Sequence, residues 1–198
     1  MMVFVSFIGA FLLTASVIWG GYQELVEDLF VFHGIKTTFV KPSRQDLLIQ
    51  AKHFTFNLDE YTFSGNSDVN VLYKDIYLSS GVFNYNIGDN RLYVHDDVFV
   101  KRKEMTITSD HVFLQVPNVL RAKGSVHFSY KAFNAFSNKV LYTVDDRKVT
   151  LLGKASLENK DDFVKGEHIE LDLNTEKVIS RGRSKIKLST QPQQQDTP

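Results

Sequence analysis

The sequence contains no cysteine, which excludes disulfide cross-links and every metal or redox site built on thiolates. Turn and breaker residues are scarce, with only 4 prolines and 11 glycines among 198 residues. An excess of charge is also lacking, because 23 Lys and Arg side chains balance 23 Asp and Glu side chains. Proteins that bind nucleic acid need a basic excess to neutralise phosphates, so we expect no nucleic-acid partner.

Apolar and aromatic residues, by contrast, are abundant. Hydrophobic residues make up 43% of the chain, and there are 16 Phe and 8 Tyr. This composition can supply a hydrophobic core, which a disordered chain cannot do. The aromatic residues, together with few Gly and Pro, favour strands over helices.

The first part of the chain carries a long uncharged run, residues 3–21. At ~1.5 Å per residue, a helix of this run nearly crosses a ~30 Å hydrocarbon layer. Trp19 and Tyr22 follow where an aromatic belt would lie. We therefore expect an uncleaved transmembrane anchor over residues 1–23 and a linker over residues 24–46. A cleaved signal peptide is the alternative, because Thr14, Ala15 and Ser16 are small residues typical of a cleavage site; a buried helix of a soluble domain is a third.

A repeat of about 29 residues follows from residue 47. Apolar residues alternate with polar ones in five triplets, a period typical of strands. The triplets begin at Phe54, Phe83, Val112, Val140 and Ile169, so the steps are 29, 29, 28 and 29 residues. Repeats of this length indicate stacked supersecondary units.

Each unit continues in phase after its triplet. A polar turn comes next, then a second strand, and in the last three units a glycine at positions 124, 153 and 182. A further alternating pair, such as Val69 and Val71, closes the unit. One such unit cannot bury its apolar face alone, so five of them are predicted to stack as an all-β sandwich, roll or solenoid with a common core over residues 47–188. The polar residues 189–198 are predicted to be a disordered tail.

No group of residues predicts catalysis or metal binding. His53, His111 and His168 recur at one slot of the repeat, just before the triplet, and Lys139 fills the same slot. This pattern is typical of outward-facing strand residues rather than zinc ligands. Neither a nucleotide-binding glycine loop nor a nucleophile with its base stands out, so we expect no enzyme and no cofactor.

Two basic stretches each allow two interpretations. Residues 101–103 (Lys-Arg-Lys) are predicted to be an exposed loop, with contact to lipid phosphates as the alternative. Four residues between 181 and 187 are basic at alternate positions, which places them on one face of a strand. Solvent or the acidic edge of a partner would face them.

Three segments carry a family resemblance: SDHVFLQVPNVLRAKGSVHF (109–128), SNKVLYTVDDRKVTLLGKASL (137–157) and KGEHIELDLNTEKVISRGRSKI (165–186). They resemble the repeats of the LptA/OstA/LptC family, which carries lipopolysaccharide between the two membranes of Gram-negative bacteria. The first two units depart from the pattern, because they lack the glycine. The resemblance implies an open β-jellyroll whose apolar groove takes acyl chains. Jellyrolls of this family also stack edge to edge into a bridge across the periplasm.

The resemblance implies two sets of site residues. The acyl chains would contact Phe54, Phe56, Phe83, Tyr85, Ile87, Leu114, Val116, Tyr142, Val144, Leu171 and Leu173. A neighbouring jellyroll would dock on Lys177, Arg181, Arg183, Lys185 and Ile186. In any β protein the same apolar triplets also simply fill the core.

An anchor followed by one jellyroll is similar to the LptC branch of the family. That resemblance implies a single-pass inner-membrane protein with its C-terminal domain in the periplasm. Its partners would be lipopolysaccharide, the inner-membrane ABC transporter and an LptA-like jellyroll. The alternatives are a soluble LptA-like bridge after signal cleavage, and a structural solenoid or surface module that binds no lipid.

Overall fold

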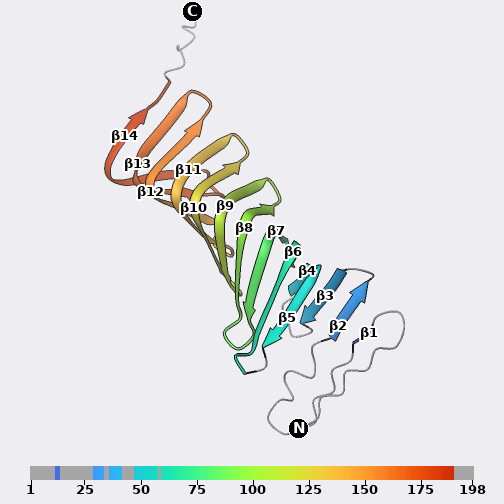
Figure 1. The fold of residues 1–198 in the computed structure, drawn as a ribbon. Coiled ribbons are helices and arrows are strands. Elements are labelled where there is room, and N and C mark those ends of the chain that lie inside the picture. Colours follow the sequence, from blue (N-terminus) through green and yellow to red (C-terminus); the bar gives the residue numbers. More distant parts are fainter. Residues whose placement is uncertain (1–11, 14–28, 34–35, 42–46, 58, 190–198) are drawn as a thin grey trace, which may run out of the picture.

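The computed structural model describes residues 12–13, 29–33, 36–41, 47–57 and 59–189. These residues form one 14-stranded antiparallel sheet in which strands that follow each other in sequence are neighbours, except that residues 47–51 and 53–57 both pair with residues 62–73 (Figure 1). The short strands near the N-terminus are β1 (Leu12–Leu13), β2 (Leu29–His33), β3 (Lys36–Lys41), β4 (Leu47–Ala51) and β5 (His53–Asn57). The long strands are β6 (Thr62–Tyr73), β7 (Ile76–Asn86), β8 (Arg91–Arg102), β9 (Met105–Gln115), β10 (Val119–Tyr130), β11 (Phe133–Thr143), β12 (Lys148–Asn159), β13 (Asp162–Asp172) and β14 (Val178–Lys187).

The two ends of the chain are only partly described. The predicted anchor, residues 1–23, lies outside the described residues except for β1. Strands β2 and β3 lie within the predicted linker and extend the sheet, since β3 pairs with β4 and β2 pairs with β3. In the part of the chain that the structure describes, no helix is long and apolar enough to cross a membrane. Of the predicted tail, only Ser189 is described.

The five predicted repeats are the strand pairs β5/β6, β7/β8, β9/β10, β11/β12 and β13/β14. The first two residues of each apolar triplet lie in the first strand of its pair and face the same side of the sheet. The third residue follows the end of the strand in the last four repeats, and residue 58 of the first triplet lies outside the described residues. Two-residue turns join each pair to the next, as between Tyr73 and Ile76. The prediction of an all-β fold built from two-strand repeats is confirmed.

Every even-numbered strand from β6 to β14 bends near its middle, where the pairing register shifts. At the bend, the backbone adopts positive φ at Ser67 and Asp68, Asp96 and Asp97, Gly124 and Ser125, Gly153 and Lys154, and Gly182. A β-bulge of this kind bends a strand and increases its twist. The apolar pair that closes each predicted unit is therefore the second half of the same strand, beyond the bend.

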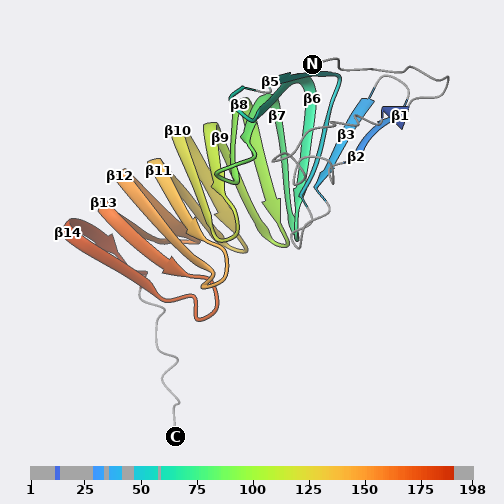
Figure 2. The ribbon, with the colours of Figure 1, turned by 90° about the horizontal axis from the view of Figure 1, so that it is seen from below.

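The bends turn the sheet into an open roll with an apolar interior. Figure 2 shows the strands stacked along the length of the molecule, each curving across it. The largest fully buried side chains are Tyr73, Tyr85, Tyr142, Phe63, Phe83, Phe128, Ile49, Ile76, Leu78, Leu92 and Met105. They form one continuous core from β4 to β13. Because strand side chains alternate, the polar residues of the same strands face outward.

Candidate functional site

All eleven residues predicted to contact acyl chains belong to this interior. Seven are buried, namely Phe83, Tyr85, Leu114, Tyr142, Val144, Leu171 and Leu173. The other four, Phe54, Phe56, Ile87 and Val116, are partly buried and pack against the core. Phe54 lies edge-on to the rings of Phe63 and Phe83, with ring centroids 5.5 Å apart in both pairs. The repeat thus places side chains that are up to 119 residues apart in sequence along one continuous core.

The interior is filled by its own side chains. Phe83 and Tyr142 are 0% exposed, and Tyr85 is 1% exposed. Side chains this completely buried leave no surface for a ligand in the present arrangement. An acyl chain could therefore occupy the interior only if the roll widened and these side chains moved apart.

The turns at the two ends of the long strands form the two rims of the roll. These rims meet along a seam that is made of side-chain hydrogen bonds rather than of a backbone ladder. The Tyr73 hydroxyl donates a hydrogen bond to the Pro117 carbonyl oxygen at 3.2 Å. The Tyr130 hydroxyl donates one to the Leu173 carbonyl oxygen at 3.0 Å. Between them, Arg102 Nη1 donates one to the Val144 carbonyl oxygen at 2.8 Å. We call these three donors and their three carbonyl acceptors the seam.

The three seam donors occupy the same place in three successive repeats. Each is the last residue of its strand, at the end of β6, β8 or β10. Each reaches an acceptor 42 to 44 residues further along the chain, which is one and a half repeats. The seam therefore ties each hairpin of one rim to a turn of the other rim, and it follows the length of the roll.

Ion pairs accompany the seam at its surface. Lys131 Nζ lies 2.6 Å from Glu176 Oε1, and both side chains are 43% exposed. Lys74 Nζ lies 3.9 Å from Asp145 Oδ1, and both of these side chains are also partly exposed. Exposed ion pairs contribute about 0–1 kcal/mol each to stability, so these two pairs hold the rims together only weakly.

Arg102 is the most heavily bonded residue of the seam. Its guanidinium also donates to the Tyr142 hydroxyl, and its Nε donates to Asp75 Oδ1 at 2.8 Å. Burial raises the pKa of the Tyr142 phenol and the neighbouring Arg102 offsets part of this rise, so the phenol is neutral at pH 7. The prediction of an exposed loop over residues 101–103 is wrong for Arg102, whose side chain is only 17% exposed at the end of β8. The signal that identifies it is its place in the repeat, which it shares with Tyr73 and Tyr130.

Asn159 is the fourth residue at this place in the repeat, at the end of β12. Its side-chain oxygen Oδ1 is buried and has no hydrogen-bond partner among the described residues. A buried acceptor without a donor is costly, by about 1–3 kcal/mol. The C-terminal end of the seam therefore offers an acceptor to a group that the described residues do not supply.

The predicted docking residues lie in and beside the last strand. Lys177 precedes β14, and Arg181, Arg183, Lys185 and Ile186 lie within it; all five are exposed. Ile186 is 57% exposed and Leu188 is 70% exposed, whereas Val164, which pairs with Ile186, packs against the core. Strand β14 pairs only with β13, so one edge of its backbone is unpaired within the described sheet. Such an edge invites pairing with another strand.

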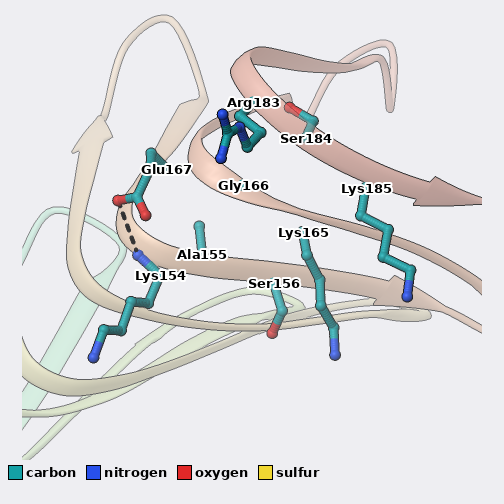
Figure 3. A pocket seen from close by; sticks show the side chains of 9 residues that line it. All are labelled: Lys154, Ala155, Ser156, Lys165, Gly166, Glu167, Arg183, Ser184 and Lys185. Carbon is teal, nitrogen blue, oxygen red and sulfur yellow. Dashed lines mark hydrogen bonds between the residues drawn. The ribbon is translucent and has the colours of Figure 1, made fainter.

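A shallow pocket of about 480 Å³ lies across β12, β13 and β14, next to this edge (Figure 3). Its lining is Lys154, Ala155, Ser156, Lys165, Gly166, Glu167, Arg183, Ser184 and Lys185. Two of these nine residues, Arg183 and Lys185, belong to the predicted docking set. The sequence did not predict the other seven as site residues.

The predicted outward histidines lie on the surface of the roll. His53 and His111 are exposed, and His168 is partly exposed and lies 2.8 Å from Glu170 Oε1. His95 and His111 are cross-strand neighbours, with ring centroids 6.1 Å apart. Across the described part of the chain, no three His, Cys, Asp or Glu side chains are placed to hold a metal ion.

Comparison with known proteins gives a family match and several similar solved structures. The family model described as LptA/(LptD N-terminal domain) LPS transport protein matches residues 77–177, just over half of the chain. The crystal structure of LptH from Pseudomonas aeruginosa is similar, with a TM-score of 0.53 and 18% sequence identity. The match covers 59% of this chain and 95% of that one, and LptH is described as the LptA homologous periplasmic component of the lipopolysaccharide transport device. No curated protein sequence matches the chain.

The structural match spans a solved jellyroll almost completely, so the predicted open β-jellyroll is confirmed. At 18% identity this likeness concerns the fold alone. The family match rests on sequence and covers strands β7 to β13, the part with the most regular repeats. The chain belongs to the LptA/LptD N-terminal-domain family of lipopolysaccharide transport proteins.

Proposed function

We propose that this protein binds the acyl chains of lipopolysaccharide inside its roll and passes them to the next protein of a periplasmic bridge. The observation that carries the proposal is an apolar interior, continuous from β4 to β13, inside a sheet whose rims meet only through side chains. A continuous apolar path with an openable side suits a long acyl chain that moves along it.

The energies favour opening of the seam by lipid. Each of the three seam hydrogen bonds contributes about 1 kcal/mol net, so the three contribute about 3 kcal/mol. Burial of an acyl chain gains about 0.8 kcal/mol per CH₂, so ten buried CH₂ groups gain about 8 kcal/mol. The difference leaves several kcal/mol for the displacement of packed core side chains. We therefore propose that acyl chains enter sideways, where Tyr73, Arg102 and Tyr130 part from their carbonyl partners.

The place of this protein in the transport route is a second part of the proposal. We propose that residues 1–23 anchor the chain in the inner membrane, with the roll over 47–188 in the periplasm, beside the ABC transporter. The exposed edge of β14, with Arg183, Lys185 and Ile186, would then receive an LptA-like jellyroll. The unpaired backbone edge, the exposed Ile186 and the acceptor of Asn159 support this end as the docking end.

Co-purification in mild detergent tests this placement. We expect the full chain to retain its N-terminal residues, as read by intact mass, and to bring down an ABC transporter. A mature chain that begins near Val17 and remains soluble would instead assign it to the LptA-like bridge.

The filled interior favours one alternative of another class, a structural module that binds no lipid. The complete burial of Phe83, Tyr85 and Tyr142 is what such a module requires. The two functions differ in whether the interior opens. Purification of the protein with bound lipopolysaccharide would support transport, and exclusion of lipid under all loading conditions would support the structural role.

A further inference from the structure

The pocket across β12, β13 and β14 carries an unbalanced positive charge. Four cationic side chains line it, Lys154, Lys165, Arg183 and Lys185, against the single carboxylate of Glu167. Glu167 accepts a hydrogen bond from the backbone nitrogen of Lys154 at 3.4 Å. Among the described residues, none of the four cations forms an ion pair with a carboxylate. The site is therefore a concave surface whose positive charge the described residues do not neutralise.

Two of these cations are direct cross-strand neighbours. Lys165 in β13 pairs in register with Lys185 in β14. Figure 3 shows their side chains extending alongside each other in the same direction. Both ammonium groups approach the ring of Phe163, at 5.3 Å for Lys165 and 6.0 Å for Lys185 from its centroid. Like charges directly opposite each other are destabilising in a sheet, and an anion bound between them would remove that cost.

The cationic pair is not a feature of the repeat. The residues that pair in register along the same row, from β6 to β12, carry no Lys or Arg: Asn70, Ser79, Phe99, Thr108, His127, Phe136 and Ser156. Only in β13 and β14 does the row become cationic, with Lys165 and Lys185. Because the earlier repeats fold without this charge, folding does not require it at the C-terminal end.

The remaining lining residues fit an oxyanion. Ser156 has a hydroxyl that can donate a hydrogen bond to it. The Ser184 hydroxyl already donates to the Gly182 carbonyl oxygen at 3.3 Å and lies 2.5 Å from Ser180 Oγ, so it contributes no free donor. Gly166 has no side chain at this point, and a Cβ there would come within 3.2 Å of the hydroxyls of Ser180 and Ser184. Lysine and arginine side chains bind phosphate through charge-assisted hydrogen bonds, which are about twice as strong as neutral ones.

We propose that this pocket binds phosphate groups, and specifically those of a phosphorylated lipid head group at the C-terminal end of the roll. The inference deepens the proposed function and rests on it for the source of the phosphate. Acyl chains inside the roll and phosphates in the pocket would together fix the orientation of the lipid as it leaves.

The first arm of the test uses inorganic pyrophosphate and the full chain at low salt. We expect saturable binding by calorimetry and a loss of about tenfold in affinity in the double variant Lys165→Gln with Lys185→Gln. The matched control is Lys123→Gln with Lys139→Gln, because Lys123 and Lys139 are also exposed, directly paired in register and outside the pocket. The control should stay within about twofold of the wild type, since only weak, screened charge effects remain. No saturable binding by the wild type, or equal losses in both double variants, would overturn the proposal.

The second arm identifies the source of the phosphate, with lipopolysaccharide micelles before and after removal of the lipid phosphates. We expect the wild type to prefer the phosphorylated form by about tenfold and the pocket variant to lose that preference. If neither form binds but pyrophosphate does, the proposed lipid function fails while the phosphate site stands. If both forms bind equally in all variants, the lipid function stands and the phosphate site is refuted. If the pocket variant binds pyrophosphate as the wild type does but no longer binds a partner protein, the pocket instead receives an acidic edge of that protein and the proposal is refuted.

Discussion

The hydroxyl of Tyr130 donates a hydrogen bond of 3.0 Å to the carbonyl oxygen of Leu173, which lies 43 residues further along the chain. Tyr130 is only 4% exposed, so this bond is formed away from water. It joins one rim of the roll to the other, where no backbone ladder connects them. The bond is thus a point at which the roll is held shut by a single side chain.

Replacement of Tyr130 by phenylalanine should weaken that closure while the ring still fills its place. We expect Tyr130→Phe to lower the free energy of unfolding by about 1–2 kcal/mol, because the Leu173 carbonyl loses its buried donor. Urea denaturation followed by circular dichroism measures this. The matched control is Tyr77→Phe, whose hydroxyl donates to Asn70 Oδ1 at the surface and should cost less than about 0.5 kcal/mol. Equal losses in the two variants would contradict a special role for the seam.

Replacing a glycine at the bend of an even-numbered strand by alanine should lower stability, and the loss should depend on the space around the new Cβ. Gly124 has a φ of +77°, and a Cβ there would come 2.1 Å from Asp110 Oδ2. Gly182 has a φ of +82° with nothing within 4 Å of such a Cβ. We expect Gly182→Ala to cost about 1–2 kcal/mol from the left-handed backbone alone, and Gly124→Ala to cost more. Thermal and urea unfolding of both variants tests this order, and a Gly124→Ala protein as stable as the wild type would contradict it.

Much of this fold could be predicted from the sequence, because the repeat itself encodes it. The triplets that begin at Phe54 and Ile169 place the strands, and their alternation places the core. The glycines at 124, 153 and 182 mark bends, but the first two repeats have Ser67 and Asp96 there, with φ of +66° and +67°. Short polar side chains tolerate this conformation, so the absence of glycine concealed two bends.

The seam could not be predicted, because it depends on the curvature of the whole roll. A donor such as Arg102 meets its acceptor one and a half repeats later, an offset that no local pattern contains. Its neighbours Lys101 and Lys103 made it look like part of an exposed basic loop. The pocket on β12 to β14 was missed for a similar reason, since Lys154, Lys165 and Lys185 become neighbours only through strand register.

A covalent link across the seam should prevent lipid from entering. The chain has no native cysteine, so Lys131→Cys with Glu176→Cys can be joined by a short bismaleimide without side reactions. We expect the linked protein to lose at least about tenfold in lipopolysaccharide binding, since the rims can no longer part while the interior stays filled. A fluorescent lipopolysaccharide titration measures this before and after linking.

The control for this link is Lys52→Cys with Asp68→Cys. Lys52 and Asp68 also form an ion pair at 2.6 Å, but they lie within the sheet, where a backbone bond already joins Lys52 to Ser67. Linking them should leave lipid binding within about twofold of the unlinked protein, because this link does not join the two rims. Unchanged binding in the seam-linked protein would refute sideways entry.

The buried phenols of Tyr73, a seam donor, and of Tyr142, which accepts a hydrogen bond from Arg102, should make stability fall at alkaline pH. Burial raises the pKa of the Tyr142 phenol above its ordinary value of 10.0, and Arg102 opposes part of this rise. Burial also raises the pKa of the Tyr73 phenol, and the neighbouring Lys74 opposes part of that rise. A raised folded pKa means that this stability is complete below pH 10 and is lost as pH rises through the folded pKa. We expect the wild type to lose stability above about pH 10, and Tyr73→Phe with Tyr142→Phe to flatten this slope. Urea unfolding from pH 8 to pH 11 checks it, and an unchanged slope in the double variant would contradict the assignment.

Passage of lipopolysaccharide acyl chains through the interior of the roll can be detected by photo-crosslinking in living Gram-negative cells. A photoreactive phenylalanine analogue at Phe83, Tyr85 or Tyr142 lies in the buried core, whereas the same analogue at Tyr93 lies on the outer face, where that residue is 39% exposed. We expect lipopolysaccharide adducts at the three interior positions and none at position 93. Folded, stable variants that give no interior adducts, or adducts of equal yield at position 93, would contradict this expectation.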